Sequence, residues 1–294
     1  MKTVIITGSN TGLGFETVKK IALNSKDYNI ILACRNKERG EKAQNKIIEE
    51  TKNPNIHFMQ LDLASLKSVK QFVENYKHEI NKPIYALVCN AGMSGNLNTQ
   101  KQFTEDGFDV IFSINHLGHF LLTNLLLPLM MKDGKIIAVS SDMHNPPLKP
   151  GERFEWLGVE AIAHPNDQMA VDRVRYSYSK LCNLYFVYEL ARILQKENSL
   201  ITVNAFNPGL MKTHYDESKK EFFEFVRLKM PERYGDLDKS SSALAELVYN
   251  ENIIKTSSNF YDRSTNYIKT SELSYNEKNA KELWEKSKEY TKNI

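Results

Sequence analysis

The sequence is poor in cysteine and has no long uninterrupted apolar run. Its 294 residues include three widely spaced cysteines, Cys34, Cys89 and Cys182, and no CxxC pair. This spacing excludes a disulfide framework and a cysteine-based zinc site, so we expect reduced, buried thiols. The longest apolar stretch, residues 120–131, is broken by polar residues and a proline. It is far shorter than the roughly 20 residues that span a membrane.

An excess of charge of one sign is also missing. There are 39 Lys and Arg against 36 Asp and Glu, and the lysines of residues 37–50 and 278–292 alternate with acidic residues. Without a clustered basic face, we exclude a nucleic-acid partner. The N-terminus enters a short apolar run with no signal-peptide cleavage site, so we predict a cytoplasmic protein with no membrane partner. A composition of 41% hydrophobic and 26% charged residues is that of a folded domain.

Short apolar runs alternate along the chain with longer amphipathic ones, the pattern of a parallel sheet with crossover helices. We expect strands at 4–7, 29–33, 56–60, 84–89, 135–140, 200–206 and 259–262. We expect helices at 13–23, 37–52, 66–80, 104–131, 178–197, 222–229, 240–249 and 276–290, with a turn at residues 132–134. No linker or repeat divides the chain. The prediction is one doubly wound α/β Rossmann domain, residues 1–294, whose seven-stranded parallel sheet carries helices on both faces and binds ligands at its carboxyl edge.

A glycine-rich turn follows the first expected strand. It consists of Gly8, Ser9, Asn10, Thr11, Gly12, Leu13 and Gly14. Glycines allow a tight turn and a close approach to a pyrophosphate, while the helix N-terminus offers N–H donors. Alone the loop is a weak signal, but its place after the first strand predicts a dinucleotide site.

The residues that end the second strand favour NADP(H) over NAD. An NAD site places Asp or Glu about 20 residues after the turn, to hold the ribose 2′-OH. Here Arg35 and Arg39 occupy this region, and a guanidinium can hold a 2′-phosphate bidentately. Arg35 pointing into water is the alternative. Asp62 ends the third strand and either accepts a hydrogen bond from adenine or caps the next helix with Ser65.

A Tyr and a Lys four residues apart, Tyr176 and Lys180, lie one helical turn apart on one face. An ammonium beside a phenol stabilises the tyrosinate and lowers the phenol's pKa toward working pH. The pair is not unique, because Tyr215 and Lys219 repeat the spacing. Placement along the chain has to decide between them.

An ordered set of motifs resolves this choice. They are the Gly8–Gly14 turn, Asn90-Ala91-Gly92, Asn115, Ser140-Ser141, Tyr176/Lys180 and Asn207-Pro208-Gly209. With these motifs the sequence resembles the short-chain dehydrogenase/reductase family over nearly its whole length. Tyr215/Lys219 lies outside the family pattern, so Tyr176/Lys180 is the expected active pair.

The resemblance implies a role for each matching position. Tyr176 would exchange the proton of the carbonyl or alcohol oxygen, and Ser141 would hydrogen-bond that oxygen. Lys180 would bind the nicotinamide ribose, and Asn115 would hold a water that relays protons to Lys180. The cofactor site would add Leu63, Asn90, Ala91, Gly92, Pro208, Gly209 and Thr213 to the residues already named. The implied activity is NADPH-dependent reduction of a ketone or aldehyde, or the reverse oxidation, with hydride supplied by the cofactor.

Three stretches resemble the retinol dehydrogenase and protochlorophyllide reductase branch. They are residues 115–123, 88–91 with 180–183, and the tail 280–287. The light-driven enzymes carry Cys after the Pro-Gly of the sixth strand, where this chain has Leu210, so the resemblance favours soluble bacterial-type ketoreductases. His116 and His119, one turn apart, lack a third ligand, so we predict no metal.

Two segments are expected to shape the substrate pocket. An insert at about 142–175 contains Met143, Phe154 and Trp156, and a loop region at about 209–235 contains several Phe and Met residues. Apolar side chains over a cofactor favour a bulky, largely apolar carbonyl compound such as an aromatic or alicyclic ketone; loop packing is the alternative. Family members assemble through the helices that carry Asn115 and Tyr176, and the insert could cover that surface, so monomer and homodimer both stay open.

Two other functions remain alternatives. A light-dependent protochlorophyllide-type reductase would show no dark activity and would bind a chlorin pigment. A non-catalytic NADP(H)-sensing module would need only the glycine turn and Arg35, which leaves the joint presence of Ser141, Tyr176 and Lys180 unexplained. That joint presence favours the enzyme.

Overall fold

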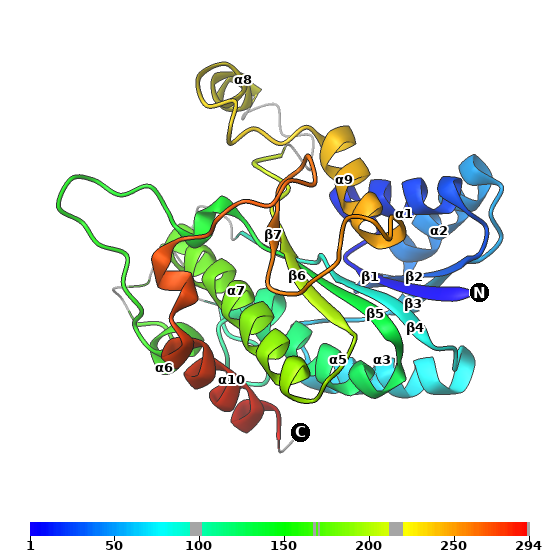
Figure 1. The fold of residues 1–294 in the computed structure, drawn as a ribbon, viewed down its shortest axis with the longest axis horizontal. Helices are drawn as coiled ribbons and strands as arrows, with labels where there is room; N and C mark the ends of the chain where they lie inside the picture. Colours follow the sequence, from blue (N-terminus) through cyan, green and yellow to red (C-terminus); the bar gives the residue numbers. More distant parts are fainter. Residues whose placement is uncertain (95–101, 167–168, 170, 212–219, 293–294) are drawn as a thin grey trace.

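A seven-stranded parallel sheet forms the centre of the computed structural model, which describes residues 1–94, 102–166, 169, 171–211 and 220–292 (Figure 1). The strands are β1 (Lys2–Thr7), β2 (Tyr28–Cys34), β3 (Ile56–Gln60), β4 (Ile84–Cys89), β5 (Met130–Val139), β6 (Thr202–Phe206) and β7 (Phe260–Tyr261). Their order is β3-β2-β1-β4-β5-β6-β7 and every pairing is parallel. The doubly wound α/β prediction is confirmed, and strand order reverses between β1 and β4, where such folds bind ligands.

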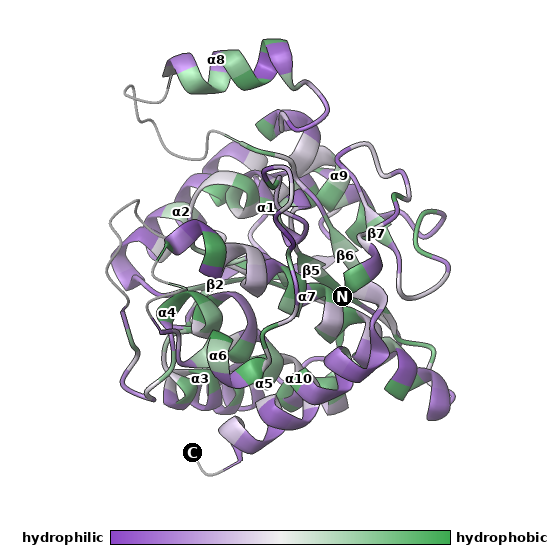
Figure 2. Ribbon diagram, turned by 90° about the vertical axis from the view of Figure 1, so that its left-hand side faces the viewer, coloured by the Kyte–Doolittle hydropathy of each residue, from purple (hydrophilic) through white to green (hydrophobic). Residues whose placement is uncertain are grey.

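Helices cover both faces of the sheet, as its buried strands require. One face carries α1 (Gly12–Asn24), α2 (Lys37–Thr51) and α9 (Leu237–Tyr249). The other carries α3 (Leu66–Glu79), α5 (Gly118–Leu126), α7 (Asp172–Lys196) and, outside α7, α10 (Glu277–Thr291). Two hydrophobic cores result, one on each side, and all three cysteines are buried and free. Figure 2 shows apolar residues lying toward the sheet and polar ones outward.

The long helix expected at 104–131 is shorter and is interrupted. It begins with α4 (Val110–Phe112), passes through a π-helical turn, η1 (Ser113–Leu117), continues as α5 and ends in the 3₁₀ turn η2 (Leu127–Leu129). Asp109 sets the start, because its Oδ1 accepts the N–H groups of Ile111 and Phe112. The segment Val110–Leu129 is long and apolar enough to cross a membrane, but it is mostly buried here, as in the core helix of a folded domain. A π turn often marks a functional position, and this one contains Asn115.

The turn expected at residues 132–134 lies inside β5 instead of before it. Ile84 pairs with Met130 and Ala86 pairs with Lys135, so a step of two residues in β4 matches a step of five in β5. The polar turn residues form an irregularity within the strand. Apolar residues Met130 and Met131 before the turn extend the strand beyond its predicted start.

The insert packs against the body of the fold. Its short helix α6 (Val159–Ala163) contacts α7 and α10. The ring of Phe154 lies 4.5 Å from that of Tyr178, and the ring of Trp156 lies 5.0 Å from that of Tyr185, both on α7. Of the two expectations for Phe154 and Trp156, these contacts favour loop packing over a place in the substrate pocket.

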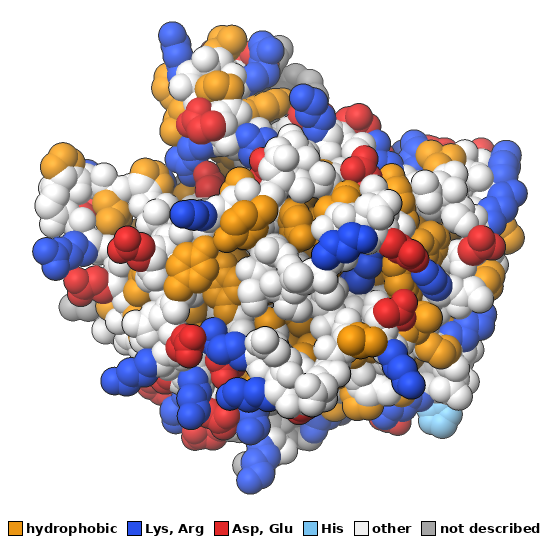
Figure 3. Space-filling view, in the orientation of Figure 1, with side chains coloured by type: hydrophobic (Ala, Val, Ile, Leu, Met, Phe, Trp, Pro, Cys, Tyr) orange, Lys and Arg blue, Asp and Glu red, His pale blue; other side chains and the backbone are white. Residues whose placement is uncertain are grey.

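Helix α8 (Lys220–Lys229), in the loop region after β6, stands away from the sheet (Figures 1 and 2). Phe222 and Phe225 are 52% and 55% exposed. Figure 3 shows hydrophobic side chains on α8 among Lys and Arg. These aromatic residues, unlike those of the insert, remain available to contact a ligand.

Candidate active site

The turn between β1 and α1 leaves backbone N–H groups open to the crevice. Gly8 and Gly12 have φ angles of +64° and +58°, in the left-handed region that favours glycine. A side chain at Gly14 would lie 2.6 Å from Asn90 Nδ2. Thr11 caps α1 without a side-chain hydrogen bond, and the first turn of α1 has no acidic residue. The positive end of the helix is thus free to receive a phosphate.

The side chains of this turn divide between core and crevice. Ser9 is buried and its hydroxyl donates to Ile6 O at 2.8 Å, while Leu13 belongs to the core. Asn10 is half-buried and Thr11 is exposed. Ser9 and Leu13 can therefore contact a cofactor only through their backbone.

Asn90-Ala91-Gly92 braces the turn from the end of β4. The Oγ1 of Thr7 accepts the N–H groups of Asn90 and Ala91, both at 2.9 Å. Asn90 Nδ2 donates to Thr7 O at 2.8 Å and to Gly8 O at 3.3 Å. Gly92 is exposed at the crevice. The side chain of Asn90 thus stabilises the turn, and its expected contact with the adenosine side stays a prediction.

Arg35 and Arg39 lie at the carboxyl edge beside the turn. Arg35 directly follows β2 and Arg39 is in the first turn of α2, and both are exposed. Asn36 caps α2 by accepting the N–H of Arg39 at 2.9 Å. Both side chains are accessible at this edge, and their expected contact with a 2′-phosphate stays a prediction.

After β3, the local structure favours the capping alternative for Asp62. Its Oδ1 accepts the N–H of Ala64 at 2.9 Å, and Ser65 caps α3. An adenine contact through the other oxygen stays a prediction. Leu63 packs tightly on α5, since a side chain at Gly118 would lie 2.5 Å from Leu63 O.

Ser141, Tyr176 and Lys180 come together at the carboxyl end of β5. Helix α7 begins at Asp172, before the expected start at 178, so Tyr176 and Lys180 share one helix. Lys180 Nζ lies 5.5 Å from the centroid of the Tyr176 ring and donates to Val139 O at 2.9 Å. Ser141 follows two residues later, and its hydroxyl lowers the pKa of the Tyr176 phenol, so the two side chains are close together. The three side chains are thus gathered at one end of the sheet.

Burial dominates the electrostatics of this site. It raises the pKa of Tyr176 to about 12, against the opposing effect of the Ser141 hydrogen bond, and the charge of Asp142 raises it further. It lowers the pKa of Lys180 to about 8. In the free protein the pKa of Tyr176 is therefore raised, not lowered as expected, and desolvation is the largest cause. Tyr176 is a phenol at neutral pH, the form that can give a proton.

Asn115 joins Tyr176's helix to the loop after β4. Its Nδ2 donates to Met93 O at 2.9 Å and to Ser179 Oγ at 2.8 Å, and its Oδ1 accepts the N–H of Met93 at 2.8 Å. A side chain at Gly92 would lie 3.3 Å from Asn115 Oδ1 and 3.5 Å from Lys180 Nζ. One acceptor position of Oδ1, beside Lys180, is left for the water that the resemblance implies.

Asp142 and Arg233 are part of the site, and the sequence had not indicated them. Ser141 Oγ donates to Asp142 Oδ1 at 3.0 Å, and Arg233 Nε donates to Asp142 Oδ2 at 2.7 Å. His144, in the same 3₁₀ turn η3 (Asp142–His144), accepts the N–H of Ser271 at Nε2, so its Nδ1 carries the proton donated to Ser141 O. Asp142 and Arg233 lie 91 residues apart in the chain, and no local pattern links them.

Pro208 and Gly209 close the site after β6. Gly209 has φ +75°, and a side chain there would lie 2.9 Å from Gly235 Cα. The carbonyl of Pro208 accepts the hydroxyl of Ser240 at 2.8 Å. Thr213, Tyr215 and Lys219 lie outside the described residues.

No group of three or more His, Cys, Asp or Glu side chains suited to a metal occurs among the residues that the structure describes. His116 Nε2 lies 2.9 Å from Ser287 Oγ, and His119 Nε2 lies 2.8 Å from Thr7 Oγ1. Both histidines are buried and serve hydrogen bonds. Burial lowers the pKa of His116 to about 3 and that of His119 to about 4, so both rings are neutral.

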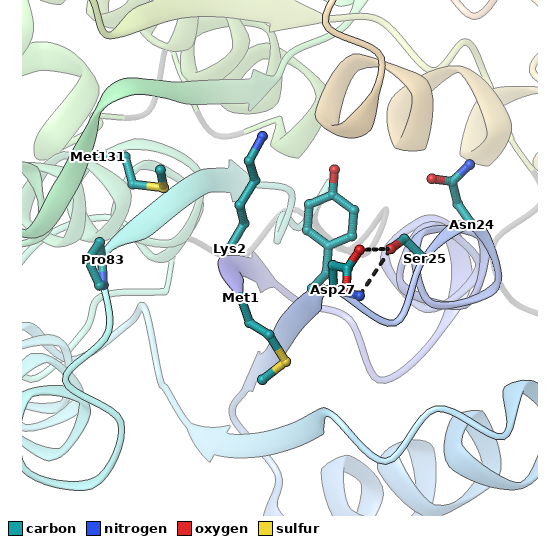
Figure 4. Close-up of a pocket in the computed structure, with 8 residues that line it drawn as sticks. Met1, Lys2, Asn24, Ser25, Asp27, Pro83 and Met131 are labelled. Carbon is teal, nitrogen blue, oxygen red and sulfur yellow. Dashed lines mark hydrogen bonds between the residues drawn. The ribbon is translucent and has the colours of Figure 1, made fainter.

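The surface of the described residues includes hollows at two places of interest. One of about 510 Å³ lies near the amino ends of β1 and β2, away from the catalytic side chains, with Lys2 and Pro83 in its lining and Ser25 bonded to Asp27 (Figure 4). A smaller one of about 310 Å³ lies beside Ser141. It is lined by Asp142, His144, Asn145, Asn207, Phe260, Ile268, Lys269, Thr270 and Ser271. Only the second is placed to hold part of a substrate.

Comparison with known proteins agrees with this geometry. Residues 2–149 match the family model for short chain dehydrogenase. Polyprenol dehydrogenase of Danio rerio is 32% identical over 304 residues, covering 97% of this chain and 85% of that protein. WW domain-containing oxidoreductase of Homo sapiens is 38% identical over 220 residues, 71% of this chain and 49% of that protein. The chain thus spans about half the length of this second relative.

Solved structures share the fold. One from Mycobacterium paratuberculosis, described as uncharacterized, is 26% identical with a TM-score of 0.75, covering 99% of this chain and 94% of that chain. A short chain dehydrogenase from Shigella flexneri complexed with NADP is 20% identical with a TM-score of 0.63, covering 89% and 96%. The family model and the sequence matches lead to one conclusion: the chain belongs to the short-chain dehydrogenase family.

Proposed function

We propose that the protein is an NADPH-dependent reductase of ketones or aldehydes that also oxidises the corresponding alcohols. The observation that carries this proposal is the meeting of Ser141, Tyr176 and Lys180 beside an open helix N-terminus. A binding module would need the turn alone. The NADP-complexed structure of similar fold supports the choice of cofactor.

Each residue has a defined task in this proposal. NADPH, when bound, supplies the hydride to the carbonyl carbon. Tyr176 gives its phenolic proton to the carbonyl oxygen. Ser141 hydrogen-bonds the same oxygen with the proton that it donates to Asp142 Oδ1 in the free protein. Lys180 binds the ribose hydroxyls with the N–H donors of its ammonium that are not bonded to Val139 O. The water beside Asn115 Oδ1 returns a proton toward Tyr176 through Lys180.

Arg35 is expected to set the preference for NADPH over NADH. Replacing Arg35 with Gln removes a charged partner of the 2′-phosphate, worth about 1.5–3 kcal/mol. The Kd for NADPH should rise roughly 10- to 100-fold, while that for NADH stays within about twofold. Fluorescence titration with both cofactors measures this. Arg153→Gln, at an exposed arginine of the insert, is the control and should change neither Kd. Equal loss of NADPH and NADH affinity in Arg35→Gln would overturn the assignment.

The decisive experiment for the activity follows the titration in the same cuvette. A panel of ketones and aldehydes is added in the dark, and NADPH consumption is recorded. Consumption supports the reductase. Tight NADPH binding without dark turnover would instead favour the sensing module, or the light-dependent reductase if a chlorin also binds; Leu210 after Pro208-Gly209 is not the Cys of the light-driven enzymes.

We propose a bulky, largely apolar substrate. Support comes from the exposed Phe222 and Phe225 of α8 and from Phe260 and Ile268 in the hollow beside Ser141. The name of the relative polyprenol dehydrogenase, which matches nearly the whole chain, also points to a long apolar alcohol. Asp142, His144 and Asn207 in the same hollow favour a compound with a polar end. Better turnover of short hydroxy- or keto-acids would contradict this class.

The pH dependence of carbonyl reduction is expected to follow Lys180. Tyr176, with a pKa of about 12, keeps its proton through the working range, whereas Lys180, with a pKa of about 8, is protonated only below that pH. Because the ammonium form binds the ribose, kcat/KM should be level to about pH 8 and then fall about tenfold per pH unit as one proton is lost. Rates from pH 6 to 10 measure this. A profile that stays level to pH 10, or rises through pH 8, excludes it.

Of the two assembly states left open, we propose the monomer. The ring of Trp284, on α10, lies 4.9 Å from that of Phe120 on α5 and 6.1 Å from that of Phe186 on α7. Trp156 of the insert donates to Glu282 of α10 at 2.9 Å. The insert and α10 together cover the helices through which family members assemble. We further propose a cytoplasmic location without a membrane partner.

A further inference from the structure

His116 and His119, one turn apart, contact different parts of the fold. Both are nearly inaccessible, at 2% and 3% exposed. His116 lies among aromatic rings and reaches Ser287 near the C-terminus. His119 lies between the end of β1 and the π turn, with Nε2 2.8 Å from Thr7 Oγ1 and Nδ1 3.2 Å from Asn115 O. Only His119 contacts residues that flank the active site.

The hydrogen bonds around Thr7 identify the proton positions on His119. Thr7 Oγ1 already accepts two N–H groups, from Asn90 and Ala91. A hydroxyl has two acceptor positions and one proton, so that proton is the only means of bonding His119. The nearer acceptor is His119 Nε2 at 2.8 Å, against 3.4 Å to Val88 O. Nε2 therefore accepts, and Nδ1 carries the proton donated to Asn115 O.

A continuous chain of hydrogen bonds results. It runs from the Asn90 and Ala91 amides through the Thr7 hydroxyl and the His119 ring to Asn115 O. Thr7 directly precedes Gly8 of the phosphate-binding turn. Asn115 holds Met93 and Ser179, and its Oδ1 shares the surroundings of Gly92 with Lys180 Nζ. One end of the chain thus lies at the cofactor turn and the other at the proton-transfer side of the site.

We propose that His119 is a positioning residue that couples the phosphate-binding turn to Asn115, so that its two nitrogens serve separate steps: Nε2 orders the turn for cofactor binding, and Nδ1 orders Asn115 for proton transfer. The role of Nδ1 in proton transfer rests on the proposed function. The role of Nε2 rests only on the binding of a dinucleotide. A merely structural histidine would not separate the two effects.

Two substitutions that each preserve one nitrogen test this separation. His119→Asn keeps a donor for Asn115 O, as Asn124 on the same helix donates to Phe120 O at 2.7 Å, but leaves the Thr7 hydroxyl without its acceptor. We expect the Kd for NADPH to rise about tenfold, the effect of one hydrogen bond, with a smaller change in kcat. His119→Gln keeps an acceptor for Thr7 but no donor for Asn115 O. It should lower kcat about tenfold, with a smaller change in Kd.

His116→Asn and His116→Gln are the matched controls, since His116 is equally buried on the same helix. They should lower Tm and leave Kd and kcat near wild-type values. The proposal is supported if His119→Asn mainly raises the Kd for NADPH and His119→Gln mainly lowers kcat. Equal changes in both variants, or changes in Tm alone, overturn it. If wild-type protein binds NADPH but shows no turnover, the proposed function fails. The Kd values of the His119 variants for NADPH then still decide the role of Nε2.

A measurement on the wild-type protein covers the case in which the variants do not fold. NMR of protein labelled with ¹⁵N-histidine reports which ring nitrogen carries the proton. We expect the Nδ1–H form for His119 and a shift of its signals on NADPH addition, larger than any shift of His116. An Nε2–H form, or no NADPH-dependent shift at His119, rejects the coupling.

Discussion

Tyr176→Phe is expected to lower kcat by about 10²- to 10⁴-fold, the range for loss of a general acid. In the proposed reduction the carbonyl oxygen receives the phenolic proton, and the hydroxyl of Ser141 is too weak an acid to replace it. The ring remains, so packing beside Lys180 should persist and the Kd for NADPH should stay within about twofold. Single-turnover kinetics at saturating NADPH, with a fluorescence titration, measure both.

Tyr178→Phe is the matched control, because Tyr178 lies on the same helix and its hydroxyl donates to Glu155 O at 2.8 Å. Loss of that hydrogen bond should lower stability by about 1 kcal/mol and leave kcat unchanged. Retention of more than a tenth of wild-type kcat in Tyr176→Phe would falsify its role as the acid. Loss of NADPH binding in that variant would show that the phenol supports the site structurally.

Arg175→Met is expected to destabilise the fold by about 3–5 kcal/mol, the cost of breaking a buried ion pair. Arg175 Nε lies 3.1 Å from Asp109 Oδ2, and its other nitrogens bond Asp172 and Met169 O. Asp109 and Asp172 are 1% and 7% exposed, so the variant leaves two carboxylates buried without this cation. At about 2–4 °C per kcal/mol, Tm should fall by roughly 10 °C; calorimetry and urea unfolding measure this.

Arg192→Met on the same helix is the control, since Arg192 pairs with Glu189 at a partly exposed position. Its expected loss is within about 1 kcal/mol. The loss of unfolding free energy in Arg175→Met should become smaller as the pH falls toward 4. Burial raises the pKa of Asp109 in the folded state, so the folded variant takes up a proton on this carboxylate before the unfolded chain does. Similar losses for both arginine variants would mean that the buried cluster adds no more than a surface pair.

The buried ion pairs of Arg175 with Asp109 and Asp172 also affect the candidate active site, because they connect the start of α4 to α7. Asp109 begins the helix that carries Asn115, and Arg175 directly precedes Tyr176. One buried ion pair therefore helps to place both Tyr176, the proposed acid, and Asn115, the proposed proton-relay residue. Local sequence signals could not show this link, since Asp109 and Arg175 are far apart in the chain.

Local patterns located most of the fold. The bounds predicted for the third and fourth strands, 56–60 and 84–89, are those observed, because short apolar runs bounded by polar residues and turns identify buried strands. The same patterns misplaced the start of the long helix, where Asp109 caps it six residues later than predicted. They also misplaced the turn at 132–134, where pairing with β4 continues on both sides.

By itself the sequence determined the doubly wound architecture, the glycine turn, the Arg35 position and the order of Asn115, Ser141, Tyr176 and Lys180 along the chain. These features depend on periodicity and on residues close in sequence. Only the tertiary structure decided that Phe154 and Trp156 pack on α7, that Arg233 holds Asp142 beside Ser141, and that His119 bonds Thr7. Such pairings join residues far apart in the chain, and their partners are selected by the burial and hydrogen-bond satisfaction of the whole fold.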